Sequence, residues 1–163
     1  MLQKLNGGTR SQSLPGGDGS LERELLGNRL AKAVASLCQT LHSQGCYFCI
    51  ENPRSSYVWC FPPIQQLLKF GQLVHFDQCE YQLTPPHLSS QSNFRIKKPT
   101  TILANHPSLL SLSRSCTTTH QHFHCCGSVK TPSGWCSVAK AAGQYPVKLC
   151  NAWAALLAGA CGK

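Results

Sequence analysis

Glu51 and Asn52 are placed where a binding site for a small polar group could form. They follow a continuous apolar run, residues 46–50, and Pro53 comes directly after them. Such a run indicates a strand that is buried on both faces. Ligands of open α/β sheets bind beyond the carboxyl ends of the strands, and a carboxylate there can recognise the edge of a nucleic-acid base. The alternative is that Glu51 caps the following turn, so both roles stay open.

A second group of chemically active side chains lies in the last third of the chain. His120, His122 and His124 alternate along it, and the neighbouring cysteines are Cys116, Cys125, Cys126 and Cys136. Alternating residues of an extended segment project to one side, and tetrahedral zinc needs four nitrogen or sulfur ligands. This segment has no C-x-x-C pair and no recognised paired spacing, so the sequence assigns no metal ligand. A non-enzymatic, zinc-supported nucleic-acid-binding module around residues 116–136 is kept as the alternative function.

The charge of the chain favours a polyanionic partner. Fifteen Lys and Arg against six Asp and Glu give a net charge of +9, in a chain whose charged share is only 13%. Nucleic acid is the expected partner through phosphate neutralisation, DNA in preference to RNA. Arg54, Lys97 and Lys98 are the predicted nucleic-acid contacts, although Lys97 and Lys98 fit an ordinary basic surface pair equally well.

The elements that must position these residues alternate between helix and strand. Residues 1–20 are expected to be a flexible leader, because they are rich in Gly, Ser, Gln and Asn. After it, the apolar spacing predicts helices at 28–45, 62–71 and 146–157, strands at 46–50, 73–76 and 100–104, a polar loop at 81–98 and weak periodicity at 113–144. Helix–strand alternation predicts an α/β fold with mostly parallel strands and a C-terminal helix.

The sequence also indicates where in the cell the protein is expected and in which state its cysteines are. The start of the chain lacks the apolar core of a signal peptide, and no stretch approaches about 18 uninterrupted apolar residues. We therefore expect a soluble, intracellular protein that does not enter a membrane. The eleven cysteines are expected to be reduced thiols, several of which serve core packing.

A longer series of short motifs carries a family resemblance. In this order the chain resembles the methyltransferase-like domain of phage and retroelement-type open reading frames, which is similar to carbon-5 cytosine DNA methyltransferases. The resemblance extends from about Arg10 to about Leu157, and it rests on Arg10-Ser11, Pro15-Gly16, Gly27-Asn28, Ile50-Glu51-Asn52-Pro53, Ser55-Ser56, Trp59, Cys79, Lys97-Lys98-Pro99-Thr100, Asn105, Cys116, His120-Gln121-His122 and Tyr145-Pro146.

The resemblance implies a truncated, Rossmann-like, three-layer domain at residues 21–158, with a tail at 159–163. Glu51 and Asn52 would match the acidic-Asn pair that contacts the target cytosine, although Pro53 replaces the usual Val. Intact members use S-adenosylmethionine, which they bind on a Gly-rich loop, and a Pro-Cys nucleophile. This sequence contains no Pro-Cys pair and no such loop before residue 45. The cofactor-binding residues are therefore unknown, and it is uncertain whether the chain is an enzyme.

These departures predict a fragment that is inactive alone and binds no cofactor. A sheet that lacks part of its strands would leave an exposed edge, and such edges invite self-association. The expected function is thus a remnant of a cytosine methyltransferase-like domain that acts on nucleic acid.

Overall fold

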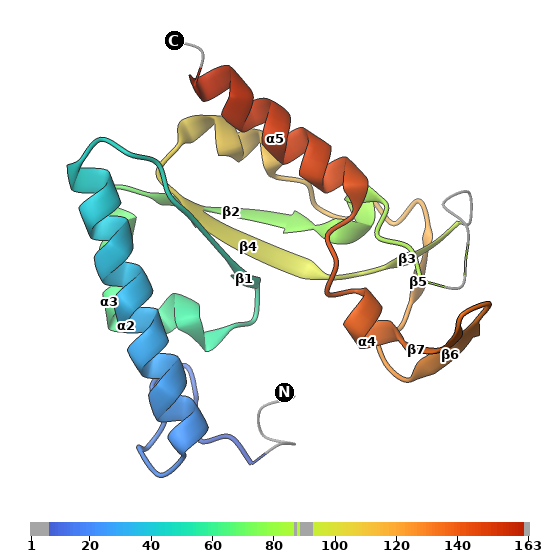
Figure 1. Ribbon diagram of the computed structural model, residues 1–163, viewed down its shortest axis with the longest axis horizontal. Coiled ribbons are helices and arrows are strands. Elements are labelled where there is room, and N and C mark those ends of the chain that lie inside the picture. Colours follow the sequence, from blue (N-terminus) through green and yellow to red (C-terminus); the bar gives the residue numbers. More distant parts are fainter. Residues whose placement is uncertain (1–6, 87, 89–92, 162–163) are drawn as a thin grey trace. The chain divides into compact units, whose positions relative to one another are not determined.

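The chain folds into helices and small sheets, which confirms the α/β class (Figure 1). The structure is a computed structural model that describes residues 7–86, 88 and 93–161. It divides into two compact units: unit 1 comprises residues 1–73 and 103–106, and unit 2 comprises residues 74–102 and 107–163. Among the described residues, no helix is long and apolar enough to cross a membrane.

Unit 1 is built around the long helix α2, Glu22–Ser43. The helix begins six residues before the apolar spacing first becomes regular, and two acidic residues, Glu22 and Glu24, lie in its first turn. Negative side chains are favourable there because the helix dipole is positive at its N-terminus. Gly45 follows the helix with φ of 72°, a left-handed conformation that glycine adopts without strain.

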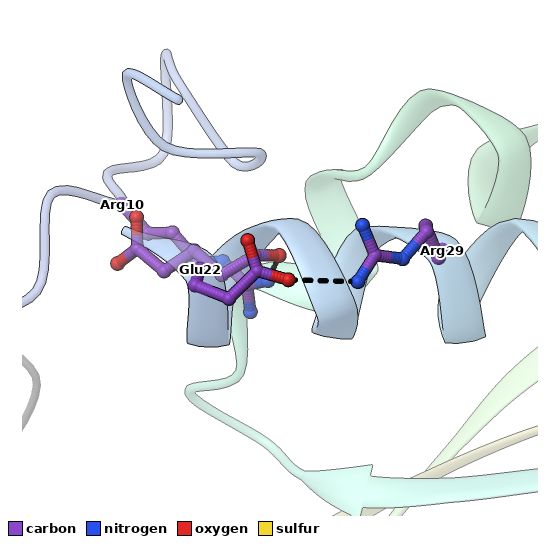
Figure 2. Close-up of polar contacts among 4 residues, drawn as sticks. Arg10, Glu22 and Arg29 are labelled. Atoms are coloured by element: carbon purple, nitrogen blue, oxygen red, sulfur yellow. Dashed lines mark hydrogen bonds and ion pairs between the residues drawn. The ribbon is translucent and has the colours of Figure 1, made fainter. Parts of the chain in front are cut away.

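The segment before α2 is hydrogen-bonded to this helix. Glu24 accepts hydrogen bonds from the backbone amide and the hydroxyl of Thr9. The Arg10 guanidinium donates to the Glu24 carbonyl oxygen and to Asn28 Oδ1, each at 2.9 Å. Figure 2 shows Arg10 beside the first turns of α2. The composition of residues 1–20 predicts a flexible leader and gives no hint of these bonds, because they depend on partners in the helix.

The remainder of unit 1 packs beneath α2. It contains strand β1 (Cys49–Pro53), the 3-10 turn η1 (Tyr57–Cys60), helix α3 (Pro62–Gln65) and the 3-10 turn η2 (Gln66–Lys69). The buried side chains of this core are Ala35, Cys38, Phe48, Phe61, Ile64, Leu67 and Leu103. Burial of this apolar surface supplies the main favourable free energy of the unit.

The largest sheet has three strands in the order β1-β4-β2. Strand β2 spans Gln72–Asp77 and β4 spans Pro99–Ala104, and each of these two strands continues from one unit into the other. The residues of β4 from Thr100 to Ala104 are all buried. Ile102, Leu103 and Ala104 are apolar, and the buried hydroxyls of Thr100 and Thr101 have hydrogen-bond partners in Gln78 and His75.

Unit 2 contains the remaining elements of the chain. These are η3 (Gln78–Tyr81), β3 (Phe94–Ile96), η4 (Pro107–Leu112), β5 (Gln121–Phe123), β6 (Ser128–Thr131), β7 (Gly134–Ser137), α4 (Val138–Ala141) and α5 (Val147–Cys161). Strands β3 and β5 pair in parallel, and β6 and β7 pair antiparallel. Helix α5 lies along η4 (Figure 1).

Several elements differ from the sequence expectation. The first strand lies three residues later than predicted, so Glu51 and Asn52 are inside β1 and do not follow it. Residues 113–144, where periodicity is weak, contain β5, β6, β7 and α4. Strands of three or four residues are too short to show an alternating pattern. Since the two-stranded sheets include an antiparallel pair, the mostly parallel Rossmann-like sheet stays a prediction.

Candidate metal centre

Four side chains of unit 2 converge in a group with the donor atoms that zinc prefers. They are Cys79, Cys116, His120 and His122, and one ligand atom from each lies within 4.8 Å of all the others. Cys79 is buried, Cys116 and His120 are half-buried and His122 is exposed. Two sulfur and two nitrogen donors form a typical ligand set of structural zinc sites.

The spacing of these atoms fits a tetrahedral metal ion. Zinc lies about 2.3 Å from a thiolate sulfur and about 2.0–2.1 Å from an imidazole nitrogen, so two nitrogens of one tetrahedron are about 3.3 Å apart and a sulfur and a nitrogen about 3.6 Å. Here the Nε2 atoms of His120 and His122 are 3.2 Å apart. Cys116 Sγ lies 3.7 Å from His120 Nε2 and 3.3 Å from His122 Nε2. One ion at the centre could therefore contact both histidines through Nε2.

Cys79 is positioned by the end of strand β2. Val74 and Phe76 of this strand are buried, and the chain turns directly after it into η3, which carries Cys79 with 2% of its surface exposed. Tyr81, two residues further on, donates a hydrogen bond to the Leu112 carbonyl oxygen at 2.7 Å. The turn is thus fixed on both sides of the thiol.

The loop with Cys116 is held by two carboxylates near Cys79. Asp77 Oδ2 accepts a hydrogen bond from the Cys116 backbone amide at 2.9 Å. Glu80 Oε1 accepts one from the Thr117 amide at 2.7 Å, and this bond lowers the pKa of the Glu80 carboxyl. Since carboxylates that orient the ligand segments are a regular feature of metal sites, both acids act as supports of the cluster.

The turn that separates Cys116 from His120 has an unusual backbone. Thr118 adopts φ of 59°, in the left-handed region that a β-branched residue rarely enters. Its amide points at the cluster, with Thr118 N 3.4 Å from Cys116 Sγ. The hydrogen bond from this amide orients the Cys116 sulfur within the cluster. Such local strain is characteristic of ligand-binding turns.

The histidines reach the cluster through strand pairing. Strand β5 pairs with β3 in a register that places His122 opposite Arg95 and Phe123 opposite Ile96. Phe123 packs against the core cluster of Leu83, Ile96, Val138 and Ala142. Since side chains alternate along an extended segment, packing of Phe123 directs His122 to the other side, where His120 also lies.

The protonation states suit a metal that displaces protons. Burial raises the pKa of the Cys79 thiol to about 12, so the thiol is neutral at neutral pH unless a cation is present. Desolvation lowers the pKa of His122, and the neighbouring His120 and Lys97 act in the same direction. Neutral imidazole is the form that binds metal, and a bound cation stabilises the thiolate.

The residues predicted for base and phosphate recognition lie outside this cluster. Glu51 and Asn52 are half-buried in β1, and Arg54 is exposed in the turn that follows, all in unit 1. Lys97 and Lys98 belong to unit 2, between β3 and β4. Lys98 Nζ donates to the Ala142 carbonyl oxygen at 3.0 Å and lies 5.5 Å from the Tyr145 ring centroid, whereas Lys97 is exposed. The roles of these five residues stay predictions.

Three of the four clustered residues were candidates from the sequence, and Cys79 was not predicted to join them. Cys79 lies 37 positions before Cys116, so its separation does not resemble a paired C-x-x-C spacing. A local signal was present in Cys116, His120 and His122, which form C-x3-H-x-H. His124, Cys125, Cys126 and Cys136 are not members of the group. The ten cysteines whose side chains are described are free thiols.

Comparisons of the chain with family models, with curated proteins and with solved structures give no match.

Proposed function

We propose that unit 2 is a non-enzymatic module that binds one zinc ion through Cys79, Cys116, His120 and His122 and that binds nucleic acid. The observation that carries the zinc site is the convergence of two sulfur and two nitrogen donors within 4.8 Å of one another, with the separations among Cys116, His120 and His122 close to those of a tetrahedral complex. Four protein ligands fill a tetrahedral shell and leave no position for a substrate or water. The zinc therefore has a structural role.

The metal would add direct bonds between segments that the hydrogen bonds of Asp77 and Glu80 already bring together. Cys79 comes from the turn after β2, Cys116 from the loop between η4 and β5, and His122 from β5. A structural zinc site contributes on the order of 10 kcal/mol of apparent binding free energy, and this energy stabilises the folded form. Zinc would thus hold short strands that could not persist alone.

The nucleic-acid part of the proposal rests on the charge of unit 2. Residues 81–163 contain no Asp or Glu and eight Lys and Arg. The two acids of the unit, Asp77 and Glu80, accept hydrogen bonds from the Cys116 and Thr117 amides. Both acidic side chains thus stabilise the loop that carries Cys116. The net charge of unit 2 is positive, which favours binding of a polyanion.

Metal content of the purified full chain tests the zinc site. We expect one zinc per chain by mass spectrometry, and substitution of cobalt should give the visible absorption of a tetrahedral thiolate complex. His122→Ala and Cys116→Ser should lose the metal. His124→Ala and Cys126→Ser are matched controls, because these residues are exposed neighbours outside the cluster, and they should retain it. Equal zinc content in all four variants would refute the site.

A second candidate is the methyltransferase-like remnant, with Glu51 and Asn52 as base-contacting residues. It is supported by the alternation of α2, β1, α3 and β2 and by the strand order β1-β4-β2, in which neighbours that are not consecutive in the chain require a crossover connection. The cofactor of this family is S-adenosylmethionine, and we expect this chain to bind none. Calorimetric titration with S-adenosylmethionine tests this candidate, since micromolar binding would favour a retained enzyme site. Self-association through a sheet edge stays a prediction that sedimentation can check.

A further inference from the structure

Trp135 exposes an unusually large aromatic surface for a residue inside a sheet. Its exposed fraction is 76%, although it belongs to strand β7. Aromatic side chains provide much of the buried area of folded proteins, so a tryptophan that leaves most of its ring in water loses that benefit. The exposed indole leaves a flat aromatic face on which another ring can stack.

The hairpin formed by β6 and β7 fixes the direction of this ring. Figure 1 shows the two strands as a short hairpin that leads into α4. Its register pairs Val129 with Cys136 and Lys130 with Trp135. Val129 packs against the core cluster beside β3, so the alternation of side chains directs Lys130 and Trp135 to the outer face. Directly opposite residues of an antiparallel pair are neighbours, so a cation lies beside the indole.

The backbone that carries this pair is held by hydrogen bonds at both ends of the hairpin. Thr131 Oγ1 donates to the Gly134 carbonyl oxygen at 2.8 Å, and this closes the turn. At the other end, the Val138 amide donates to the Gly127 carbonyl oxygen at 3.1 Å. Ser137 Oγ accepts from the Lys140 amide and caps α4. A platform that is ordered before binding pays less entropy when a ligand arrives.

The charge around the hairpin selects the class of partner. Lys130 and Lys140 are exposed, and residues 81–163 hold no acidic side chain. Flat aromatic rings beside cations bind single-stranded nucleic acid, because each base can stack on the ring while its phosphate meets the positive charge. Bases of a duplex are already stacked on one another and offer no free face to an indole. The pair therefore suits an unpaired strand.

We infer that the outer face of the β6–β7 hairpin is a binding site for single-stranded nucleic acid, in which a base stacks on Trp135 and Lys130 contacts the adjacent phosphate. The inference rests on the nucleic-acid part of the proposed function and names the form of nucleic acid that unit 2 takes. Single-stranded DNA and RNA share this chemistry, so both are included in the test.

The experiment measures binding of the zinc-loaded full chain to a fluorescent oligonucleotide of mixed sequence by anisotropy. The same base sequence is tested as single-stranded DNA, as single-stranded RNA and as duplex DNA. Trp135→Ala should weaken single-strand binding about tenfold or more, the effect expected from loss of one stacked base. Trp135→Phe should restore most of the affinity. Lys130→Gln should lower the slope of log affinity against log salt by about one.

Matched controls separate stacking from general effects of substitution. Val147→Ala replaces a residue that is 73% exposed in the same unit but cannot stack, and it should leave binding unchanged. Zinc content, measured on each variant, shows whether the fold is intact. Binding should also quench tryptophan fluorescence in the wild type, and the quenching should be reduced in Trp135→Phe.

The outcomes distinguish the inference from the function on which it rests. Equal single-strand affinity of Trp135→Ala and the wild type overturns the stacking site. Stronger binding of duplex DNA than of either single strand also overturns it, but leaves the proposal of nucleic-acid binding intact. No binding to any oligonucleotide overturns both the inference and the nucleic-acid proposal, and leaves the zinc site to its own test. Polyglutamate is the control for acidic protein segments. If it binds as tightly as the single strands and its binding also depends on Trp135, the surface belongs to acidic protein segments and the inference is refuted.

Discussion

The α2 region of unit 1 and the β3–β7 region of unit 2 are stabilised in different ways. The first has a 22-residue helix over a cluster that contains Phe48, Phe61, Ile64 and Leu67. The second has strands of three or four residues on Leu83, Ile96, Val138 and Ala142, beside the Cys/His cluster that could hold a metal ion. Long apolar faces can be stabilised by packing, whereas very short strands need another source of stability. We propose that a metal takes the place of a large core in the second region.

The largest effect should follow removal of zinc. Treatment of the full chain with a strong chelator should cost unit 2 several kcal/mol, because structural zinc contributes on the order of 10 kcal/mol in small domains. Hydrogen exchange followed by mass spectrometry should show loss of protection at residues 112–137, with little change in α2. Re-addition of zinc is the control and should restore protection. Equal loss in both regions would contradict the comparison.

The reciprocal experiment removes packing from unit 1. Leu67 has 0% of its surface exposed, so Leu67→Ala should destabilise this unit by about 2–5 kcal/mol through lost burial and the resulting cavity. Zinc content should stay at the wild-type value. The matched control is Leu68→Ala at the neighbouring exposed position, where we expect less than about 0.5 kcal/mol. Chemical denaturation monitored by circular dichroism measures both changes, and a loss of zinc in Leu67→Ala would couple the two regions.

The same contrast explains how far the sequence could predict the molecule. Apolar spacing locates α2, the strand at 73–76, the strand at 100–104 and the last helix, because each buries a continuous or periodic face. The strands β5 to β7 could not be predicted in this way, because they are too short to show a periodic spacing of apolar residues. In the candidate site, His120 and His122 are suggested by alternation, but Cys79 enters through tertiary folding that brings η3 to the later loop.

The leader provides the next test, because it is attached to α2 by polar contacts. Arg10→Ala removes the donors to the Glu24 carbonyl oxygen and to Asn28 Oδ1, and it should cost about 2 kcal/mol, since one buried and one half-buried residue would lose a hydrogen bond. Arg10→Lys is the control for charge, and it should recover part of this loss because a single ammonium cannot reproduce the forked geometry. Thermal unfolding measures the difference. Wild-type stability of Arg10→Ala would show that the leader is not held by this contact.

Acid should weaken a second contact of the leader, the one between Thr9 and the Glu24 carboxylate. The hydrogen bond from the Thr9 side chain lowers the pKa of Glu24 below its ordinary value of 4.5, and the Thr9 and Arg10 amides act in the same direction. A carboxyl with a lowered pKa in the folded state stabilises the protein above the unfolded value, and this contribution is lost as pH falls through the folded value. We therefore expect unit 1 to lose stability below about pH 4.5. Glu24→Gln should show a smaller decline than the wild type over the same range when denaturation is followed at several pH values, and an identical decline would exclude Glu24 as a source.

The smallest effect should come from the most visible charge pair of unit 1. Glu22 Oε1 and Arg29 Nη2 form an ion pair at 2.9 Å on α2 (Figure 2), but 78% and 63% of their side chains are exposed. Water and salt screen such a pair, and the two long side chains lose entropy when they meet. Arg29→Gln should therefore change the free energy of unfolding by less than about 0.5 kcal/mol, in contrast to Arg10→Ala, although both remove one arginine from the same helix region. Glu22→Gln should cost slightly more, because the carboxylate also interacts with the positive end of the helix dipole. A double-mutant cycle in low and high salt measures the pair itself, and a coupling as large as the effect of Arg10→Ala would mean that exposed charges, and not the network of Arg10 and Glu24, stabilise the start of α2.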